Sequence, residues 1–451
     1  MNQIKGEKKI FKKLSSVQLL ATGYFIVTLF FALLLTLPIA SKTNKQQSFI
    51  DALFMSSSGI STTGLTVVDI GSFYSLFGQI ILMLNFQIGG IGYMAFIVFI
   101  AYLLEIKLSV KNQIVASESV AGAYPGFSYR FFNTVITFTF IFEIIGGIIL
   151  FFYWLQIYPL PTAMYFGIFH SVSAFCTAGF CLFPESLMSY KNSITVNLVI
   201  NILSLIGGIG FFVLNEIYMI TKKAIRKERY KRMSTHSLLA IAVTIIVIVT
   251  GAAIIFISEK WPSSAGIKER ILASSFQAIS ASTTDGFNSI DIGAMSSTSL
   301  FMIILLMFIG ASPGSTGGGI KTTTLGVIFV TIWSKLKGKE DSNLFKRRIS
   351  DDIKDKASLI FFLMIFAAIL DLLVLTATEK FSFLQILFEI ISALGNTGLS
   401  TGITSNLSNL SKILLSITMF IGRVGPLTIG LALVERTKPS FRYPDGDIFV
   451  G

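Results

Sequence analysis

Long stretches of the chain carry almost no charge, and this feature limits what the chain can fold into more than any other. Each stretch is long enough for a helix to cross a bilayer, which takes about 20 residues. Charged residues make up only 13% of the 451 residues, about half their share in soluble domains. The sequence therefore predicts an all-α polytopic membrane protein and excludes a soluble enzyme. The expected spans are 17–39, 75–104, 131–155, 194–220, 237–257, 299–333, 357–377 and 411–434.

The distribution of basic residues predicts the orientation of these spans. Most of the 36 Lys and Arg residues fall in alternate connections, and cytoplasmic loops are the ones enriched in Lys and Arg. We therefore expect a multi-pass protein of the cell membrane with both termini in the cytoplasm. The net charge of +12 follows from this inside bias, so we expect no nucleic-acid partner. The basic segments are an arm (1–16), three loops (105–130, 221–236 and 333–356) and a tail (435–451).

A string of residues recurs four times at fixed offsets. In each copy a Phe precedes a Gly by ten residues, a Ser precedes that Gly by six, and a Thr or Asn precedes it by two. The four copies begin at Phe54, Phe169, Phe276 and Phe388. A second, glycine-containing string lies in the span that follows each copy, at 88–92, 206–210, 309–314 (expanded) and 421–425.

These recurrences predict four copies of one unit, each made of a span, a re-entrant pore loop and a second span. Every copy starts and ends on the same side, so the copies are parallel and we expect pseudo-fourfold symmetry around a central pore. The expected units are a cytoplasmic arm (1–16), four repeats (17–104, 131–220, 237–333 with a broken second span, and 357–434) and a cytoplasmic tail (435–451).

The first string suits a cation filter. Each copy reads as a half-helix too short to span, followed by polar residues and a glycine. Backbone carbonyls at membrane depth need partners that lipid does not offer, and four such strands can replace the hydration shell of a cation. Ordinary outer loops with a packing glycine are the alternative, which explains one such string better than four. The expected filter residues are Thr62, Thr63, Gly64, Thr177, Ala178, Gly179, Thr284, Asp285, Gly286, Asn396, Thr397 and Gly398.

The third copy breaks its second span with a run of glycines and a proline at 310–319. Such a run cannot continue a helix, and irregular backbone at this depth must line protein or water. We expect it to lie below the filter and act as a gate, with a static kink as the alternative. A phosphate-binding loop is excluded, because Ile320 spoils the spacing to Lys321. The expected gate residues are Gly310, Ser312, Gly314, Gly317, Gly318, Gly319 and Arg423.

Charged residues inside apolar segments are functional candidates. Arg423 either raises a barrier beside a cation path or anchors the gate loop through carbonyls. Equally, it pairs with an acid such as Glu143 or Asp371. Asp285 either attracts cations at the mouth or holds a neighbouring strand, and the sequence leaves both roles open.

Three further side chains lie close to the filter strings. Asp69 and Asp291 follow two of the strings and are expected to form an acidic vestibule, which attracts cations. His170 lies at the base of its half-helix, where we expect it to pack and not to bind a metal. The two cysteines predict neither a disulfide framework nor a zinc site.

Taken together, these motifs resemble the Trk/Ktr/HKT superfamily of cation transporters, and most of all the KtrB-type membrane subunits of bacterial Ktr potassium uptake systems. The resemblance implies a filter glycine in each repeat, an intramembrane gate loop and an arginine below the filter. A serine at the first glycine is associated with sodium selectivity in some plant relatives, so Gly64 favours potassium. The resemblance rests on the four filter strings, Gln87-Ile-Gly-Gly-Ile-Gly92, Phe308-Ile-Gly310, the 310–319 loop, Ile421-Gly-Arg423 and Arg442-Tyr-Pro-Asp-Gly446.

The resemblance also implies partners. Similar proteins are homodimers with one pore per subunit, and they sit on a cytosolic octameric ring of RCK-type nucleotide-binding subunits that respond to ATP and ADP. Many are stimulated by Na+. We therefore expect no covalently bound cofactor, K+ as the permeating ion, and ATP or ADP on the partner subunit. One departure bears on selectivity and sodium dependence: the third filter usually reads Arg-Thr-Ala-Gly-Phe, whereas here it is Thr283-Thr-Asp-Gly286-Phe.

We expect a potassium-conducting membrane subunit embedded in lipid, and not an enzyme. A coupled secondary transporter for sodium, or for sodium and potassium, is the alternative. The parallel repeats disfavour it, because alternating-access carriers usually use inverted repeats. A membrane enzyme is a third hypothesis, but the sequence offers no Ser-His-Asp set and only two His.

Overall fold

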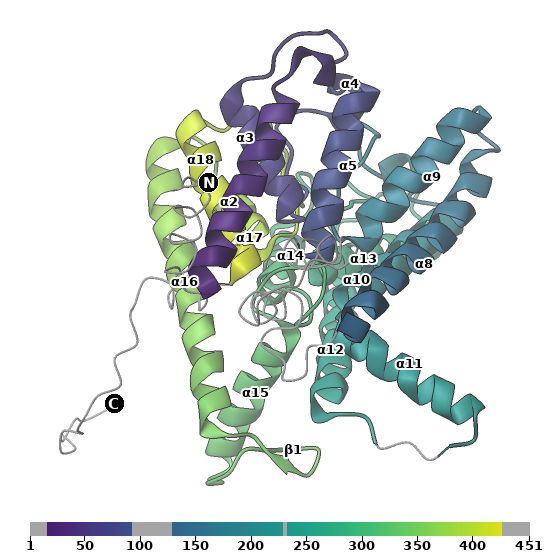
Figure 1. Ribbon diagram of the computed structural model, residues 1–451. Helices are drawn as coiled ribbons and strands as arrows, with labels where there is room; N and C mark the ends of the chain where they lie inside the picture. The colour runs from purple at the N-terminus through teal and green to yellow at the C-terminus, as the bar shows by residue number, and fades with distance from the viewer. Residues whose placement is uncertain (1–15, 93–128, 229–231, 426–451) are drawn as a thin grey trace, which may run out of the picture.

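The computed structural model describes residues 16–92, 129–228 and 232–425, which fold mainly into helices (Figure 1). The predicted N-terminal arm up to residue 15, the 105–128 part of the first basic loop and the C-terminal tail lie outside the described residues. So do the ends of two predicted spans, 93–104 and 426–434.

Four long helices precede the four filter strings. Their outer faces are apolar and exposed, as with Ile246 on one and Phe362 on another, which is the surface a helix presents to lipid. In Figure 1 the last of them runs down one side of the molecule. These first helices are α2 (Ser16–Leu35), α8 (Tyr129–Trp154), α12 (Thr235–Ser258) and α16 (Asp351–Thr378).

Four shorter helices contain the first half of each filter string. Their N-termini lie in loops, and two begin at Ser side chains, Ser48 and Ser382, that accept hydrogen bonds from the first turn; such caps satisfy backbone N–H groups that have no partner within the helix. The Phe that opens each string is fully buried and anchors its helix in the core. The short helices are α3 (Phe49–Ile60), α9 (Leu160–Phe175), α13 (Ile267–Thr283) and α17 (Phe383–Gly395).

The second helix of every copy stops at a glycine with positive φ or, in the second copy, two residues before one. The longest has 16 residues, or about 24 Å, which is less than the thickness of a hydrocarbon core. We expected only the third copy to be broken, but the predicted span 194–220 also breaks, with a bend of 99°. The second helices are α5 (Leu76–Ile91), α10 (Ile194–Gly208), α14 (Ser297–Ile309) and α18 (Asn409–Val424). The glycines are Gly92, Gly210, Gly310 and Gly425.

Few of the described helices meet the length and hydropathy of a complete span. Three do so alone, Asn133–Trp154, Thr235–Ser258 and Asp351–Thr378, and a fourth arises if the bent pair of α10 and α11 (Phe211–Ile225) is taken as one span. The predicted span 299–333 is divided between α14 and α15 (Thr322–Leu336). The breaks divide apolar runs into short helices. The number of spans is therefore better judged from the length of the apolar runs than from the length of single helices.

The short helices and second helices pack in a closed order. Each short helix contacts the second helix of its own copy and that of the preceding copy: α3 packs on α5 and α18, α9 on α10 and α5, α13 on α14 and α10, and α17 on α18 and α14. Since the last copy therefore contacts the first, the four filter strings are brought around one centre.

The remaining elements are small. A two-stranded antiparallel hairpin lies after α15 at the bottom of Figure 1, where the sequence predicted only helices and loops. Its register pairs Asn343 with Arg348. These elements are η1 (Pro38–Ala40), α4 (Ile70–Phe73), η2 (Met188–Tyr190), β1 (Asn343–Leu344), β2 (Arg347–Arg348) and η3 (Thr404–Asn406).

Candidate functional site

Each short helix ends in the same two-step turn of the backbone. The residue two before the filter glycine adopts the left-handed conformation, and the glycine itself has a φ between +63° and +92°. L-residues rarely adopt a positive φ, and glycine does so without steric cost. The left-handed residues are Thr62, Thr177, Thr284 and Asn396, and the glycines are Gly64, Gly179, Gly286 and Gly398.

The Ser of each string holds the strand that follows it. In all four copies its carbonyl accepts a hydrogen bond of 2.8–2.9 Å from the N–H of the residue before the filter glycine. In the first and fourth copies the hydroxyls of Ser58 and Ser392 also accept from the glycine N–H, at 3.0 Å. In the other two copies, Ser173 and Ser280 instead donate to the carbonyl just after the glycine. The Ser is therefore a strand support in every copy.

The four strands meet in a ring. A methyl group placed on Gly64 would lie 3.3 Å from the Cα of Gly179 and would collide with the carbonyl oxygen of Ala178. The same relation links each strand to the next: Gly179 faces the Asp285 carbonyl, Gly286 that of Thr397, and Gly398 that of Thr63. The carbonyls of the residues before the glycines thus lie within contact of a neighbouring strand, and no side chain fits between them.

A cavity of about 370 Å³ opens on one side of this ring. All four filter glycines line it, together with Asp69 and Glu185. The Asp69 carboxylate also accepts from two N–H groups at the start of α4. Asp291 is not among the lining residues; its carboxylate accepts from the N–H of Gly293 at 2.9 Å. The predicted acidic vestibule therefore contains Asp69, does not contain Asp291, and includes Glu185, which the sequence analysis did not single out.

The loop between α14 and α15 lies on the other side of the ring, against the left-handed residues. Thr316 makes most of these contacts. Its carbonyl accepts from the Thr62 hydroxyl at 2.9 Å, and its own hydroxyl donates to the carbonyl of Phe175 at 3.2 Å and lies 2.9 Å from the Thr177 hydroxyl. Its N–H donates to Gly207 at 3.1 Å. The sequence analysis missed Thr316, whose only signal was a hydroxyl in a glycine run.

Other residues of this loop make further contacts with the strands and within the loop. Gly317 and Gly318 lie against the third and fourth strands, where the Gly318 N–H donates to the Thr284 hydroxyl at 3.2 Å and a methyl on Gly318 would lie 2.7 Å from the Cβ of Asn396. The ammonium group of Lys321 donates hydrogen bonds to the carbonyls of Gly317, at 2.6 Å, and Gly318. The buried Ser312 hydroxyl bonds to that of Thr322, and the loop glycines with positive φ are Gly310, Gly314 and Gly319.

Arg423 ties the loop to the first and fourth copies. Its guanidinium donates to the carbonyls of Thr316 and Gly89. Glu143 instead accepts from the side chain of Gln87 at 2.9 Å, and Asp371 accepts from a threonine hydroxyl at 2.6 Å. Among the contacts of the described residues, Arg423 thus bonds to main-chain carbonyls and not to either acid.

The comparisons with known proteins fit this arrangement. A family model described as cation transport protein, TrkH, matches residues 4–441. The chain belongs to the TrkH family of cation transport proteins. The sequence-based resemblance to Trk and Ktr proteins is therefore confirmed, and the chain is a membrane protein of a transporter family, not of an enzyme family.

Relatives of this TrkH-family chain match it along nearly its whole length. Ktr system potassium uptake protein B of Bacillus subtilis (strain 168) is 38% identical over 438 residues, which cover 96% of each chain. Potassium/sodium uptake protein NtpJ of Enterococcus hirae is 32% identical over 455 residues, which cover 99% of each. The crystal structure of the potassium transporter TrkH from Vibrio parahaemolyticus matches with a TM-score of 0.69 at 20% identity, covering 92% of this chain and 85% of that chain. This last match shows that the fold is shared.

Asp285 is the unusual residue among the predicted filter residues of this TrkH-family chain. Its side chain is 1% exposed, and neither carboxylate oxygen has a hydrogen-bond partner among the described residues. The carboxyl group therefore does not lie open at the mouth, and its side chain does not hold a neighbouring strand by a hydrogen bond. The contact to that strand is made by its main-chain carbonyl, against Gly179.

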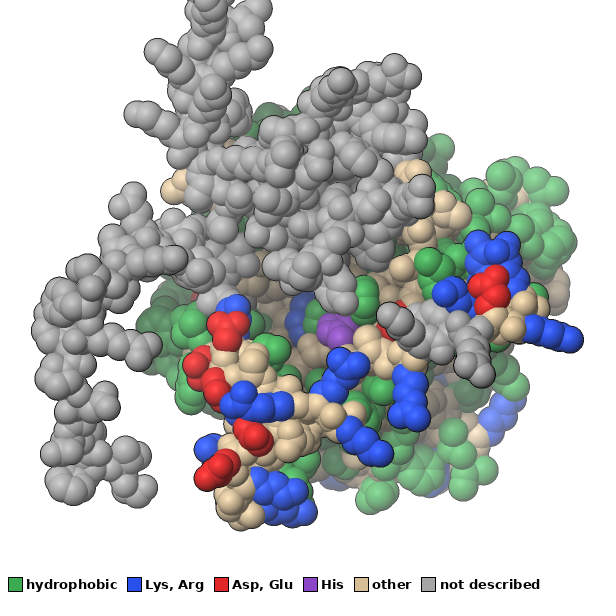
Figure 2. Space-filling view, turned by 60° about the horizontal axis from the view of Figure 1, so that its bottom comes forward, with side chains coloured by type: hydrophobic (Ala, Val, Ile, Leu, Met, Phe, Trp, Pro, Cys, Tyr) green, Lys and Arg blue, Asp and Glu red, His purple; other side chains and the backbone are tan. Residues whose placement is uncertain are grey.

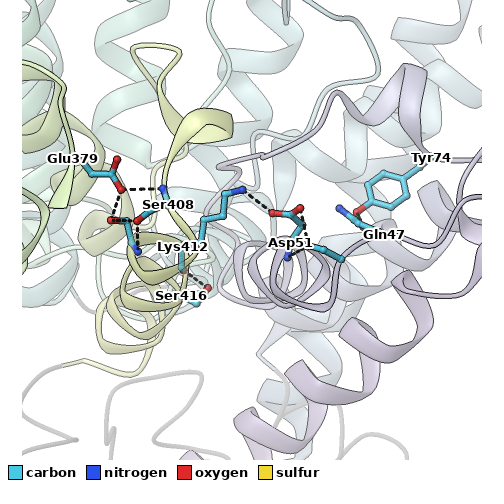
Figure 3. A network of polar contacts seen from close by, with 9 residues as sticks. Gln47, Asp51, Tyr74, Glu379, Ser408, Lys412 and Ser416 are labelled. Atoms are coloured by element: carbon cyan, nitrogen blue, oxygen red, sulfur yellow. Dashed lines mark hydrogen bonds and ion pairs between the residues drawn. The ribbon is translucent and has the colours of Figure 1, made fainter.

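An ion pair that the sequence analysis did not predict joins the fourth and first copies of this TrkH-family chain. Lys412, near the start of α18, donates to Asp51 in the first turn of α3 at 2.8 Å, and Figure 3 shows the two side chains pointing toward one another. Their side chains are 10% and 26% exposed. On the α18 side, Glu379 accepts from the N–H of Ser408, the helix cap, at 2.9 Å. We call this contact the seam, because the fourth and first copies are not consecutive in the chain.

Proposed function

We propose that this protein is the membrane subunit of a potassium uptake system and that K+ passes through the ring of four strands. The observation that carries the proposal is the closed contact of each filter glycine with a carbonyl of the next strand. Main-chain oxygens gathered in this way can replace the water around a cation. The names of the relatives as potassium uptake proteins support the same function. The units around the ring are four parallel repeats with pseudo-fourfold symmetry.

The loop at 310–321 is the gate in this proposal. It lies directly against the inner ends of three strands through Thr62, Thr177 and Thr284, and Arg423 holds it there. A loop in this position obstructs an ion that leaves the filter. Conduction therefore requires the loop to move away from the strands, while the strands stay in place.

The basic face of the molecule is the cytoplasmic face in this proposal. Figure 2 shows Lys and Arg side chains gathered on the side that carries the β1–β2 hairpin. Cytoplasmic loops are enriched in these residues, so the termini are cytoplasmic and this face is available to a cytosolic partner. The protein acts as a homodimer on an RCK-type ring, with ATP or ADP bound to the ring and Na+ as an activator. The exposed basic residues of the described part of this face include Lys222, Arg226, Lys227, Lys335, Lys337, Lys339, Lys346, Arg347 and Arg348.

A rubidium-uptake assay in proteoliposomes tests the function. We expect external K+ to compete with 86Rb+ at concentrations at least tenfold lower than Na+, a difference of about 1.4 kcal/mol in binding. Equal competition by the two ions, or no uptake by protein that is folded and inserted, would contradict the proposal. The name of NtpJ as a potassium/sodium uptake protein makes coupled transport the competing function. A fixed ratio of Na+ to Rb+ moved per cycle would favour that carrier.

A further inference from the structure

The filter strings share one buried position whose residue type differs from copy to copy. It is the residue directly after the opening Phe, one turn or more before the C-terminus of each short helix. Its side chain is fully buried in all four copies, and its chemistry differs in each. The four residues are Met55, His170, Gln277 and Glu389.

Three of these side chains make the same hydrogen bond, each within its own copy. Each accepts a hydrogen bond from the main-chain N–H of the residue twelve positions later, which is the third residue after the filter glycine. The bonds run from Leu182 to His170 Nε2 (3.2 Å), from Ser289 to Gln277 Oε1 (2.9 Å) and from Thr401 to Glu389 Oε1 (3.0 Å). Three unlike side chains that make one bond indicate a common role.

The histidine is fixed in the form that this bond needs. Nε2 accepts from the Leu182 N–H, so the ring proton lies on Nδ1, which donates to the carbonyl of Phe166 at 2.8 Å. The ring stacks on Phe183 with centroids 4.8 Å apart. His170 therefore packs at the base of its helix, as expected, and also holds the strand.

Glu389 makes the most extensive contact of the set. Besides the Thr401 N–H, its carboxylate accepts from the hydroxyls of Ser400 at 2.5 Å and Thr404 at 2.8 Å. The Glu389 side chain thus joins three residues of the segment beyond Gly398, whereas Gln277 bonds to one residue in its own copy. Ser400 and Thr404 line the outer cavity, so Glu389 holds the wall of the ion path from behind.

The first copy has no such bond. Met55 occupies the position, and a thioether is at most a weak acceptor. Val67, the residue twelve later, has no hydrogen bond to Met55 in this part of the structure. The strand that follows Gly64 is therefore supported by Ser58 but not by a side chain at this position.

We propose that His170, Gln277 and Glu389 are positioning residues for cation selectivity. Each fixes the strand just outside its filter glycine, so that the carbonyls of the ring keep their spacing when an ion passes. Glu389 contributes most, and the first strand is the most deformable quarter of the filter. This inference rests on the proposed potassium function.

The test compares matched variants in the 86Rb+ assay, with K+ and Na+ as competitors. Glu389→Met installs the residue of the first copy and removes both oxygen acceptors. We expect the preference for K+ over Na+ to fall about tenfold, with a smaller change in maximal uptake. Glu389→Gln keeps an acceptor for the Thr401 N–H, as Gln277 does for Ser289, and should stay within about twofold of the parent. Ile390→Met, a buried neighbour on the same helix, is the control and should leave the preference unchanged.

Two results would overturn the inference. One is a parent-like K+ preference in Glu389→Met. The other is an equal loss in Glu389→Gln, which would assign the effect to charge and not to the bond. If Glu389→Met does not fold, Gln277→Met makes the same test on the third strand with no change of charge, and it must lower the preference. A parent protein that does not discriminate between K+ and Na+ would refute the proposed function, whereas a selective parent with unaffected variants would refute only the positioning role.

Discussion

The filter strands and the loop at 310–321 are both irregular backbone within the apolar part of the molecule, but they are held in different ways. Each strand is supported from within its own copy, by the Ser of its string and, in three copies, by the residue after the opening Phe. The loop bonds to its own copy at Thr284 and is also supported by the other three copies, through Thr62, Gly207 and Arg423. Local support keeps a strand in place when a distant part moves. Because its supports come from several copies, the loop can be loosened step by step while the supports within each strand's own copy remain.

The largest effect is expected from a change in the ring itself. Gly64→Ser adds a side chain at a φ of +92° that collides with the Ala178 carbonyl, so the ring must widen. We expect the preference for K+ over Na+ to fall at least tenfold in the 86Rb+ assay, about 1.4 kcal/mol or more. Gly402→Ser is the control, because Gly402 has a φ of +91° and open space around it, and it should keep the preference. Unchanged selectivity in Gly64→Ser would contradict the role of the filter strands in choosing between K+ and Na+.

Shortening the loop should raise uptake without loss of selectivity. Deleting residues 317–319 removes its contacts with the third and fourth strands, while the supports within each copy remain. We expect the initial 86Rb+ uptake to rise about fivefold, as a shift toward the open state. The ratio of K+ to Na+ competition, measured in the same vesicles, serves as the control. Normal or lower uptake by folded protein would remove the gating role.

A smaller rise is expected when only the anchor is removed. Arg423→Gln weakens the bonds to the Thr316 and Gly89 carbonyls, but the loop keeps its threonine contacts. Uptake should rise about two- to threefold, because a Gln amide can still donate to one of the two carbonyls. In the 317–319 deletion the same substitution should add nothing, because both changes act on one element. Additive effects would mean that Arg423 acts on the ion and not on the loop.

The smallest effect on transport is expected at the seam. Lys412→Met leaves Asp51 without its partner, and a partly buried charge without its pair lowers stability by about 2 kcal/mol. Thermal unfolding in detergent should report this loss, while selectivity stays at the parent value. The double variant with Asp51→Asn should recover part of the stability. A double variant as unstable as Lys412→Met alone would show that the ion pair does not stabilise the seam.

The filter strands could be predicted from the sequence because their support is local. Offsets of ten, six and two residues place the Phe, the Ser and the left-handed residue around the glycine in every copy, and each offset now has a physical cause in burial, a hydrogen bond or a backbone conformation. The glycines of the second string are explained in a similar way. Gly89, Gly207 and Gly422 press against carbonyls at the ends of the short helices, where a side chain would collide.

The rest could not be predicted, because it depends on which copies become neighbours. Thr316 gains its meaning only when the third copy's loop reaches the first and second copies. Lys412 reads as an ordinary residue near a helix start until α18 lies beside α3. The break at Gly210 was hidden by an apolar run that continues on both sides of it, since hydropathy does not record a change of direction. His170 was placed correctly, but its bond to Leu182 depends on the path of the strand.

The contacts of the filter glycines run in one rotational sense, from the first copy to the second, third and fourth and back to the first. In each copy this residue must be glycine because a carbonyl of the neighbouring copy leaves no room for a side chain. A single copy therefore cannot change this residue unless its neighbour changes as well. The glycine is the same in all four copies, whereas one shared position behind the circuit carries Met, His, Gln and Glu.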